Sequence, residues 1–288
     1  MTEARFAETL ALAESIEGMM SRFSVSIFDC LLAHQAARGL DGDIVELGVF
    51  RGKSAAVLAR HLTEKQSLHL YDINDNFDRT RLERTGKRMI FNVANTLDLR
   101  PRDFAGLKRS VRFCHIDASH MLMPTMHEMA LADYMLADNG ILCLDDYTNL
   151  NYSQILAAAF KYLFTTSTDL TMFMVTNEKA YLCRRKSFAP HEAYILDELR
   201  QDMAVRGMED TCLARTDLSP DYRAIHVRLK EGNETDDLYG ASIYGQFYRP
   251  SGNPGFVQRL AHKYRDAVPV PMRQLINKVR RRSARSAS

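Results

Sequence analysis

A regular alternation of short apolar runs and helix-like stretches constrains the fold of this chain more than any other feature. Seven runs have the length and composition of β-strands, at residues 43–48, 67–73, 88–94, 111–117, 140–146, 170–176 and 180–185. Helix-like stretches lie between most of them, at residues 53–64, 78–86, 124–137 and 152–166. Strands that alternate with helices form a mostly parallel sheet covered on both faces. The sequence therefore predicts an α/β, doubly wound sheet.

The connection between the last two strand-like runs is only three residues long: Asn177, Glu178 and Lys179. A parallel crossover needs about a dozen residues or more, so these two strands must form an antiparallel hairpin. In open parallel sheets, ligands bind beyond the carboxyl ends of the strands. We therefore expect the functional side chains to follow directly after the parallel strands.

The regions on either side of this core have weaker patterns. Residues 1–40 read as a helical segment, and residues 41–185 contain the alternating core. In the rest of the chain, residues 191–207 are typical of a helix and residues 225–231 of a strand. We treat residues 186–288 as an extension that supplies a lid, acceptor contacts or oligomer contacts.

Composition limits the partners and the cellular setting. Apolar residues make up 46% of the 288 residues and charged residues 26%, as in ordinary globular proteins. The net charge of +2 and the lack of a basic stripe with interleaved aromatics argue against nucleic acid as a partner. Only residues 273–288 are locally basic, either as a solvated end or as a contact for an anionic surface. No run approaches the roughly 20 apolar residues that span a bilayer, and the acidic N-terminus is unlike a secretory signal. Five scattered cysteines without a CxxC pair suit a cytoplasmic protein with reduced thiols.

Two glycines follow the first strand-like run, in the stretch from Ile44 to Ala56, IVELGVFRGKSAA. A phosphate-binding loop requires its first glycine at the position of Leu47, and Gly48 is one residue too close to the second glycine. A dinucleotide fingerprint requires glycines where this chain has Phe50 and Lys53. Neither motif fits, which argues against ATP hydrolysis and against dinucleotide binding.

The remaining pattern consists of Glu46, Gly48 and Gly52, followed by Ser54. A glycine at a strand exit lets the backbone approach a ligand closely. The second glycine opens a helix whose free N–H groups favour a carboxylate, whereas the acid favours a cation. Asp72, at the end of the second strand, is placed to accept two ribose hydroxyls. The alternatives are a structural glycine turn and, for the aspartate, a residue that begins a helix or turn.

Four segments together resemble the class I S-adenosylmethionine-dependent methyltransferases: VELGVFRGKS, YDIND, CHIDASH and GILCLDDYTN. Within that superfamily, the chain most resembles the macrocin-type sugar O-methyltransferases, over residues 23–185. The resemblance implies a Rossmann-like sheet of seven strands in the order 3-2-1-4-5-7-6, with strand 7 antiparallel. It also implies S-adenosylmethionine as cofactor and metal-assisted O-methylation of a small hydroxylated acceptor, such as a sugar or glycosylated metabolite.

The resemblance also implies roles for individual residues around the cofactor. From the methionine end to the adenine, the matching positions are Glu46, Gly48, Gly52, Ser54, Asp72, Asn95, Thr96 and Asp117. The first four would surround the methionine part, and Asp72 would bind the ribose. Asn95 and Thr96 would approach the adenine, and Asp117 is a further candidate for cofactor binding.

Three acids follow the fourth and fifth strands: Asp117, Asp145 and Asp146. Because these strands are neighbours in the family's order, the acids would converge at one edge of the sheet. Converging carboxylates repel one another unless a cation lies between them, and such oxygen ligands suit Mg²⁺. In related O-methyltransferases the matching acids bind a metal, which would orient the acceptor hydroxyl and lower its pKa. The alternative is that the acid pair caps the next helix or forms a turn.

His120 is the candidate general base, because an imidazole can take a hydroxyl proton near neutral pH. Asp117 is the second catalytic candidate. His115 lies inside the fourth strand, where alternation is expected to point it away from Asp117 and His120. This expectation argues against iron-dependent hydroxylation, as in relatives of the cephalosporin hydroxylases, because that chemistry needs two histidines and one carboxylate together.

A second class of function is a non-catalytic binding or scaffold protein on the same fold. The intact glycine loop and the acids after two strands argue for an enzyme, since a scaffold has no need of converging carboxylates. The resemblance further implies a homo-oligomer that acts on a small-molecule acceptor, without an integral membrane segment.

Overall fold

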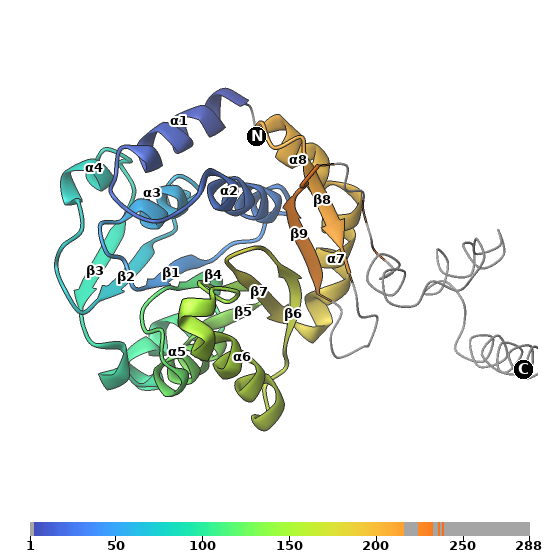
Figure 1. The fold of residues 1–288 in the computed structure, drawn as a ribbon. Coiled ribbons are helices and arrows are strands. Elements are labelled where there is room, and N and C mark those ends of the chain that lie inside the picture. The colour runs from blue at the N-terminus through green and yellow to red at the C-terminus, as the bar shows by residue number, and fades with distance from the viewer. Residues whose placement is uncertain (1–2, 216–223, 233–235, 237, 239–288) are drawn as a thin grey trace, which may run out of the picture. The chain divides into compact units, whose positions relative to one another are not determined.

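The computed structural model of the protein describes residues 3–215, 224–232, 236 and 238. In these residues, nine strands form one sheet in the order β3-β2-β1-β4-β5-β7-β6-β9-β8 (Figure 1). The strands are Asp43–Leu47 (β1), Leu68–Asp72 (β2), Met89–Val93 (β3), Val111–Ile116 (β4), Leu136–Leu144 (β5), Leu170–Val175 (β6), Ala180–Arg184 (β7), Thr211–Ala214 (β8) and Ile225–Leu229 (β9).

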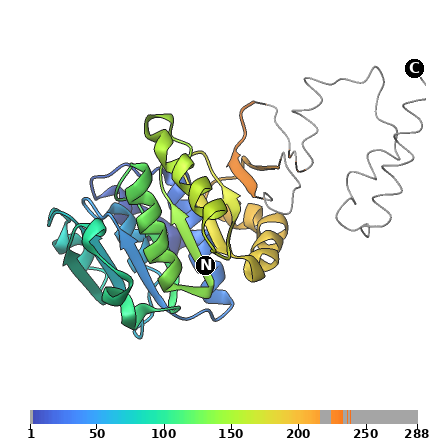
Figure 2. The ribbon, with the colours of Figure 1, turned by 90° about the horizontal axis from the view of Figure 1, so that it is seen from below.

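Helices cover both faces of this sheet. They are Glu3–Glu14 (α1), Arg22–Ala37 (α2), Lys53–Ala59 (α3), Arg79–Glu83 (α4), Leu122–Met135 (α5), Ser153–Thr165 (α6), Phe188–Asp197 (α7) and Leu199–Val205 (α8). In Figure 2 the green helix α5 and the yellow-green helix α6 lie in front of the strands, and the blue N-terminal helices lie behind them. Two short 3₁₀ helices also border the site, Thr96–Asp98 (η1) and Leu150–Tyr152 (η3).

The strand order confirms the predicted Rossmann-like topology. The five strands from β3 to β5 pair in parallel, and β7 pairs antiparallel with both β5 and β6. The first seven strands therefore follow the expected order, with the short hairpin between β6 and β7 where the three-residue connection predicts it. Strands of the centre are buried on both faces, which explains why they read as continuous apolar runs.

The sheet has nine strands rather than the seven expected, because the C-terminal extension adds two. β9 pairs in parallel with β6, with Met174 opposite Ile225, and β8 lies at the sheet edge beyond it. The strand predicted at residues 225–231 is thus present. The single helix predicted at residues 191–207 is wrong in detail: it is divided into α7 and α8 at Glu198.

One boundary differs from the expectation for a physical reason. The helix was expected to reach residue 137 and the fifth strand to begin at residue 140, but α5 ends at Met135 and β5 begins at the next residue. Gly140 lies inside β5, where an added Cβ would be 2.7 Å from the carbonyl oxygen of Val111. This glycine therefore permits close approach of β4 and β5 at a register shift, rather than ending a helix.

A buried ionic cluster ties the extension to the N-terminal helices. The Asp29 carboxylate of α2 lies 2.8 Å from Nε2 of His61 and accepts a 2.7 Å hydrogen bond from Nε of Arg206, which follows α8. Burial alone would raise the pKa of Asp29, but its two partners outweigh burial and lower that pKa. Residues 3–213, 224–232 and 236 accordingly belong to one compact unit.

Two further expectations concern the described part of the chain. None of its helices combines the length and apolar character that a membrane crossing requires. All five cysteines lie in this described part, where they are buried and none forms a disulfide. The basic stretch at residues 273–288 lies outside the described residues.

Candidate active site

A cavity of about 620 Å³ opens beyond the carboxyl ends of β1 to β4, where open parallel sheets bind their ligands. Ligand pockets typically measure roughly 300–1,000 Å³. Six of the predicted site residues line it, namely Gly48, Asp72, Asn95, Thr96, Asp117 and His120. Five others do not, namely Glu46, Gly52, Ser54, Asp145 and Asp146. The cavity therefore unites residues that follow four different strands.

Gly48 lines the cavity and also lies against the end of the neighbouring strand β4, where there is no room for a side chain. Its φ of 88° is left-handed, and an added Cβ would lie 1.9 Å from the carbonyl oxygen of Asp117. The Asp117 backbone N–H in turn donates to the Leu47 carbonyl over 2.8 Å. The sequence predicts that Gly48 lets the backbone approach a ligand closely. In the structure, Gly48 instead lets the end of β1 approach the end of β4.

Asp72 organises the loop after β1. Its Oδ2 accepts hydrogen bonds from the backbone N–H groups of Val49 (2.8 Å) and Phe50 (2.9 Å), and its Oδ1 accepts from Asn74 (2.9 Å). These bonds hold Phe50 in a left-handed conformation, with φ of 50°. Because each carboxylate oxygen has two lone pairs, Asp72 can still accept hydroxyl groups from within the cavity.

Gly52 has a structural role outside the cavity. It has a φ of 92° at the N-cap of α3, and a Cβ there would lie 2.8 Å from the Leu82 side chain. α3 has only 7 residues. We expected Gly52 to begin a helix whose N-terminus faces a ligand. Gly52 does begin α3, but it does not line the cavity.

The predicted adenine side of the cavity is held by hydrogen bonds to the following residues. Asn95 accepts from the Leu97 N–H over 3.1 Å and so caps η1. Thr96 donates to Oε1 of Glu128 over 2.7 Å, and the other oxygen of that buried carboxyl has no hydrogen-bond partner. Burial raises the pKa of Glu128 to about 7. Sequence reasoning missed Glu128, since a single acid on an apolar helix gives no motif.

A chain of buried charged groups runs behind the cavity, from β1 to the β6–β7 turn. Nδ1 of His115 lies 2.7 Å from Oε1 of Glu46, and its Nε2 lies 3.2 Å from Oδ2 of Asp145. The same Asp145 oxygen accepts a hydrogen bond from the ammonium of Lys179. Burial lowers the pKa of His115, but the hydrogen bonds and charges of the two acids outweigh burial and raise it to about 9. His115 is therefore an imidazolium at neutral pH.

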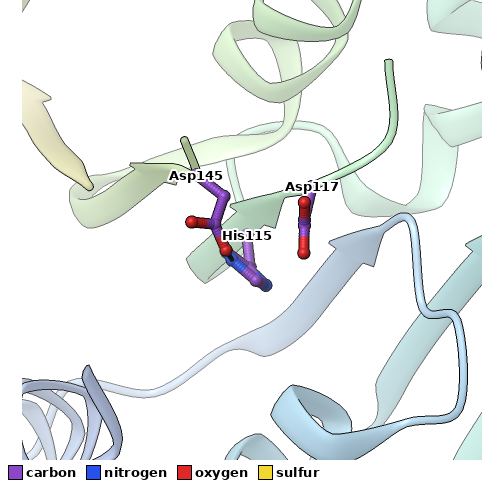
Figure 3. Close-up of side chains that lie close together, drawn as sticks. All are labelled: His115, Asp117 and Asp145. Atoms are coloured by element: carbon purple, nitrogen blue, oxygen red, sulfur yellow. Dashed lines mark hydrogen bonds and ion pairs between the residues drawn. The ribbon is translucent and has the colours of Figure 1, made fainter. Parts of the chain in front are cut away.

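The predicted orientation of His115 is wrong. Figure 3 shows His115, Asp117 and Asp145 close together, and one ligand atom from each lies within 4.8 Å of the others. The reason is that residues two apart in a strand point to the same face, so alternation places positions 115 and 117 together. Even so, each candidate metal group among the described residues contains one histidine and two acids. The two-histidine set of an iron hydroxylase is therefore not assembled there.

A second group lies at the edge of the cavity. Nε2 of His120 is 3.1 Å from Oδ2 of Asp146 and 3.7 Å from Oδ1 of Asp117, and its ring stacks on Tyr152 at a centroid distance of 4.1 Å. The two carboxylates raise the pKa of His120 to about 10. The imidazole expected to be a neutral base is therefore protonated at neutral pH before substrates bind.

Asp146 is held in place by its own backbone. It has a φ of 52°, a left-handed conformation that aspartate adopts more readily than most residues. Its N–H donates to Oδ1 of Asp145 over 2.8 Å, and its Oδ1 accepts from Asn149 over 2.9 Å. Strained backbone of this kind is often found at functional sites. The acid pair thus forms a hydrogen-bonded turn, as the alternative reading expected, and also faces the cavity-lining His120.

The three predicted metal ligands do not form one set of carboxylates. Asp117 groups with His115 and Asp145 on one side, and with His120 and Asp146 on the other. Both oxygens of Asp145 already have partners, the Asp146 N–H on one and Lys179 with His115 on the other. A buried ammonium that sequence reasoning missed therefore lies against one of the three acids.

Residues 45–147 match the family model described as a methyltransferase domain. No curated protein matches the sequence. Among solved structures, cofactor-bound Rv0187 from MTB is 16% identical with a TM-score of 0.50, over 63% of this chain and 90% of that one. An O-methyltransferase from Bacillus cereus in complex with SAH is 14% identical with a TM-score of 0.48, over 62% and 89% of the two chains. Apo CalS11, a TDP-rhamnose 3'-O-methyltransferase of calicheamicin biosynthesis, is 15% identical with a TM-score of 0.46, over 62% and 93%.

The fold is that of the class I methyltransferases, with the expected strand order and the terminal antiparallel strand. The matched domain runs from β1 to Tyr147 and so contains all the residues that line the cavity. Residues 45–147 thus match a methyltransferase domain on this fold, in agreement with the resemblance of the four sequence segments.

Proposed function

We propose that the protein transfers a methyl group from S-adenosylmethionine to a hydroxyl oxygen of a small acceptor, such as a sugar or glycosylated metabolite. The observation that carries this proposal is the group of Asp117, His120 and Asp146 at the rim of the cofactor-sized cavity. Acids and an imidazole that lie beside a cavity can bind and deprotonate a hydroxyl group. They would not be needed to bind the cofactor alone.

In this proposal the cofactor occupies the cavity, with its ribose at Asp72 and its adenine between Asn95 and Thr96. Gly48 borders the methionine part. The other three predicted residues do not line the cavity and would support the loop after β1 rather than contact the cofactor: Glu46, Gly52 and Ser54. S-adenosylmethionine supplies a methyl group on a positively charged sulfur atom when it is bound.

His120 is the proposed general base, and its proton must leave before it can act. The positive sulfur of a bound cofactor favours that loss, because a nearby like charge lowers the pKa of an imidazolium. The acceptor hydroxyl then gives its proton to the imidazole as its oxygen takes the methyl group. Asp117 and Asp146 orient the imidazole and stabilise its charge once the proton has been accepted.

The expected divalent cation does not fit the three acids as a set. Asp145 is engaged on both oxygens and is neutralised by Lys179 and His115. Mg²⁺ demands nearly octahedral oxygen coordination and usually keeps several waters, and a buried ammonium repels it. The other two acids are Asp117, which lines the cavity, and Asp146, which does not, and His120 already pairs with both. The proposed mechanism therefore contains no step that depends on a metal.

The remaining parts of the proposal concern partners and setting. A small-molecule acceptor suits a cavity of this size, lined by residues at the ends of four strands. A homo-oligomeric state, a cytoplasmic location and an acceptor-binding or lid role for residues 186–288 stay predictions from the sequence. Calibrated mass measurement of the purified protein in solution tests the first of these.

Calorimetric titration with S-adenosylhomocysteine tests the cofactor site. We expect micromolar binding, and a loss of at least about tenfold, or about 1.4 kcal/mol, in Asp72→Asn. Asparagine keeps one oxygen for the loop amides but loses the charge and half of the acceptor capacity for ribose hydroxyls. Asp75→Ala is the matched control, since Asp75 is on the same loop, pairs with Arg79 and does not line the cavity. Absence of binding to the wild-type protein would refute the proposal.

A further inference from the structure

We propose that the Lys179 ammonium takes the place of a divalent cation at the acid cluster, so that the site works without a bound metal. This inference rests on the proposed function, because it concerns how the same acids are neutralised. It departs from the metal-binding role that the sequence resemblance implies for Asp117, Asp145 and Asp146.

The register of the sheet places Lys179 at this point. β5 and β7 are antiparallel, with Leu144 opposite Ala180. The residue after Leu144, Asp145, therefore lies beside the residue before Ala180, Lys179. The β6–β7 turn fixes the backbone there: the Lys179 N–H donates to Oγ1 of Thr176 over 3.1 Å, and its carbonyl accepts from the Thr176 N–H over 2.8 Å. The position of the lysine beside the acid is thus set by strand pairing and by two backbone hydrogen bonds of the turn.

The ammonium is enclosed. The Lys179 side chain is 2% exposed, and its Nζ lies 5.9 Å from the centroid of the Phe28 ring. His115 packs edge-on against the same ring at a centroid distance of 5.1 Å. A buried lysine is costly unless it is paired, and Asp145 is the acid that pairs with it. Removal of either partner would leave the other charge uncompensated in the interior.

The charges of the cluster nearly balance without a metal. Four carboxyl groups and three cationic side chains are linked by the contacts described above: Glu46, Asp117, Asp145, Asp146, His115, His120 and Lys179. At most one negative charge is left over when all are ionised, and a sulfonium cofactor in the adjacent cavity offsets it. A divalent cation would instead leave an excess of positive charge beside Lys179 and His115. The lysine therefore supplies the positive charge that three acids would otherwise draw from solution.

The test measures the binding of Mn²⁺ to chelator-treated full-length protein, with electron paramagnetic resonance as the readout. We expect wild-type protein to bind Mn²⁺ more weakly than about 1 mM. Lys179→Met keeps the apolar stem but removes the charge, and we expect Mn²⁺ affinity to rise at least about tenfold because Asp145 is released. The double variant Lys179→Met with Asp145→Asn should lose this gain. Lys161→Ala, an exposed lysine of α6, is the control and should not change Mn²⁺ binding.

Two results would overturn the inference. One is wild-type protein that binds Mn²⁺ well below about 1 mM, a result that is decisive even if Lys179→Met does not fold. The other is a folded Lys179→Met protein that gains no affinity for Mn²⁺. S-adenosylhomocysteine binding, measured on each protein, reports folding and separates the two proposals. Failure of the cofactor to bind refutes the proposed function, whereas a metal bound by a cofactor-competent wild type refutes only the role of Lys179.

Discussion

The buried carboxyl group of Glu128 should make the protein less stable as the pH rises. Glu128 is fully buried beneath the cavity, and only one of its oxygens has a hydrogen-bond partner, the hydroxyl of Thr96. Its pKa is raised from 4.5 to about 7 because burial disfavours the ionised form. We expect Glu128→Gln, which imitates the protonated acid, to stabilise the protein at alkaline pH and to have little effect in acid.

The size of this effect follows from the two pKa values. The folded state holds the Glu128 proton more tightly than the unfolded state, so stability falls as the pH rises through the interval from 4.5 to about 7. A pKa difference of one corresponds to about 1.36 kcal/mol, which gives a penalty of about 3 kcal/mol at pH ~8. At pH ~5, near the start of the interval, the penalty is less than about 1 kcal/mol.

Urea unfolding of the wild type and of Glu128→Gln at both pH values measures the effect. The difference between the two proteins isolates Glu128, since other titrating groups contribute equally to each. Glu64→Gln, at an exposed position after α3, controls for the loss of a negative charge and should show no such change with pH. A difference in the free energy of unfolding that is the same at both pH values would refute the argument that Glu128 is held neutral by burial.

Two further variants test the loop after β1. Gly48→Ala should prevent folding or cost several kcal/mol, because its Cβ would lie 1.9 Å from the Asp117 carbonyl oxygen; thermal unfolding measures this, and a melting temperature within a few degrees of the wild type would contradict it. Glu46→Gln should change S-adenosylhomocysteine affinity less than about threefold, because Glu46 contacts His115 and does not line the cavity. A calorimetric loss as large as that of Asp72→Asn would instead place Glu46 against the cofactor.

The sheet could be predicted from the sequence because each strand is a local signal. Buried parallel strands are continuous apolar runs, and the short connection before β7 dictates an antiparallel pair. The two strands of the extension were harder to place. β9 pairs with β6 through a connection of about fifty residues along the chain, and no local pattern states which edge a distant strand will join.

The candidate site was predicted less completely, since its chemistry depends on contacts between distant residues. Asp72 is the last residue of β2 and His120 lies on the loop after β4, so position alone placed them at the cavity. Lys179 lies beside Asp145 because β7 pairs antiparallel with β5, and these two strands are not consecutive in the chain. The connection that the sequence predicts as antiparallel is the one between β6 and β7, so no local signal predicts that the acid after β5 meets this lysine.

The buried charges have a consequence for how the cofactor loop and the acceptor side of the site are related. Glu46 is on β1, under the glycine loop, and Lys179 is on the hairpin beyond β5. His115 and Asp145 join them through hydrogen-bonded contacts across the neighbouring strands β4 and β5. Because each member neutralises the next, the loss of one charge alters the electrostatics at both ends of the chain. Glu46 is therefore linked to Asp145 through the His115 imidazolium, behind the cavity rather than across it.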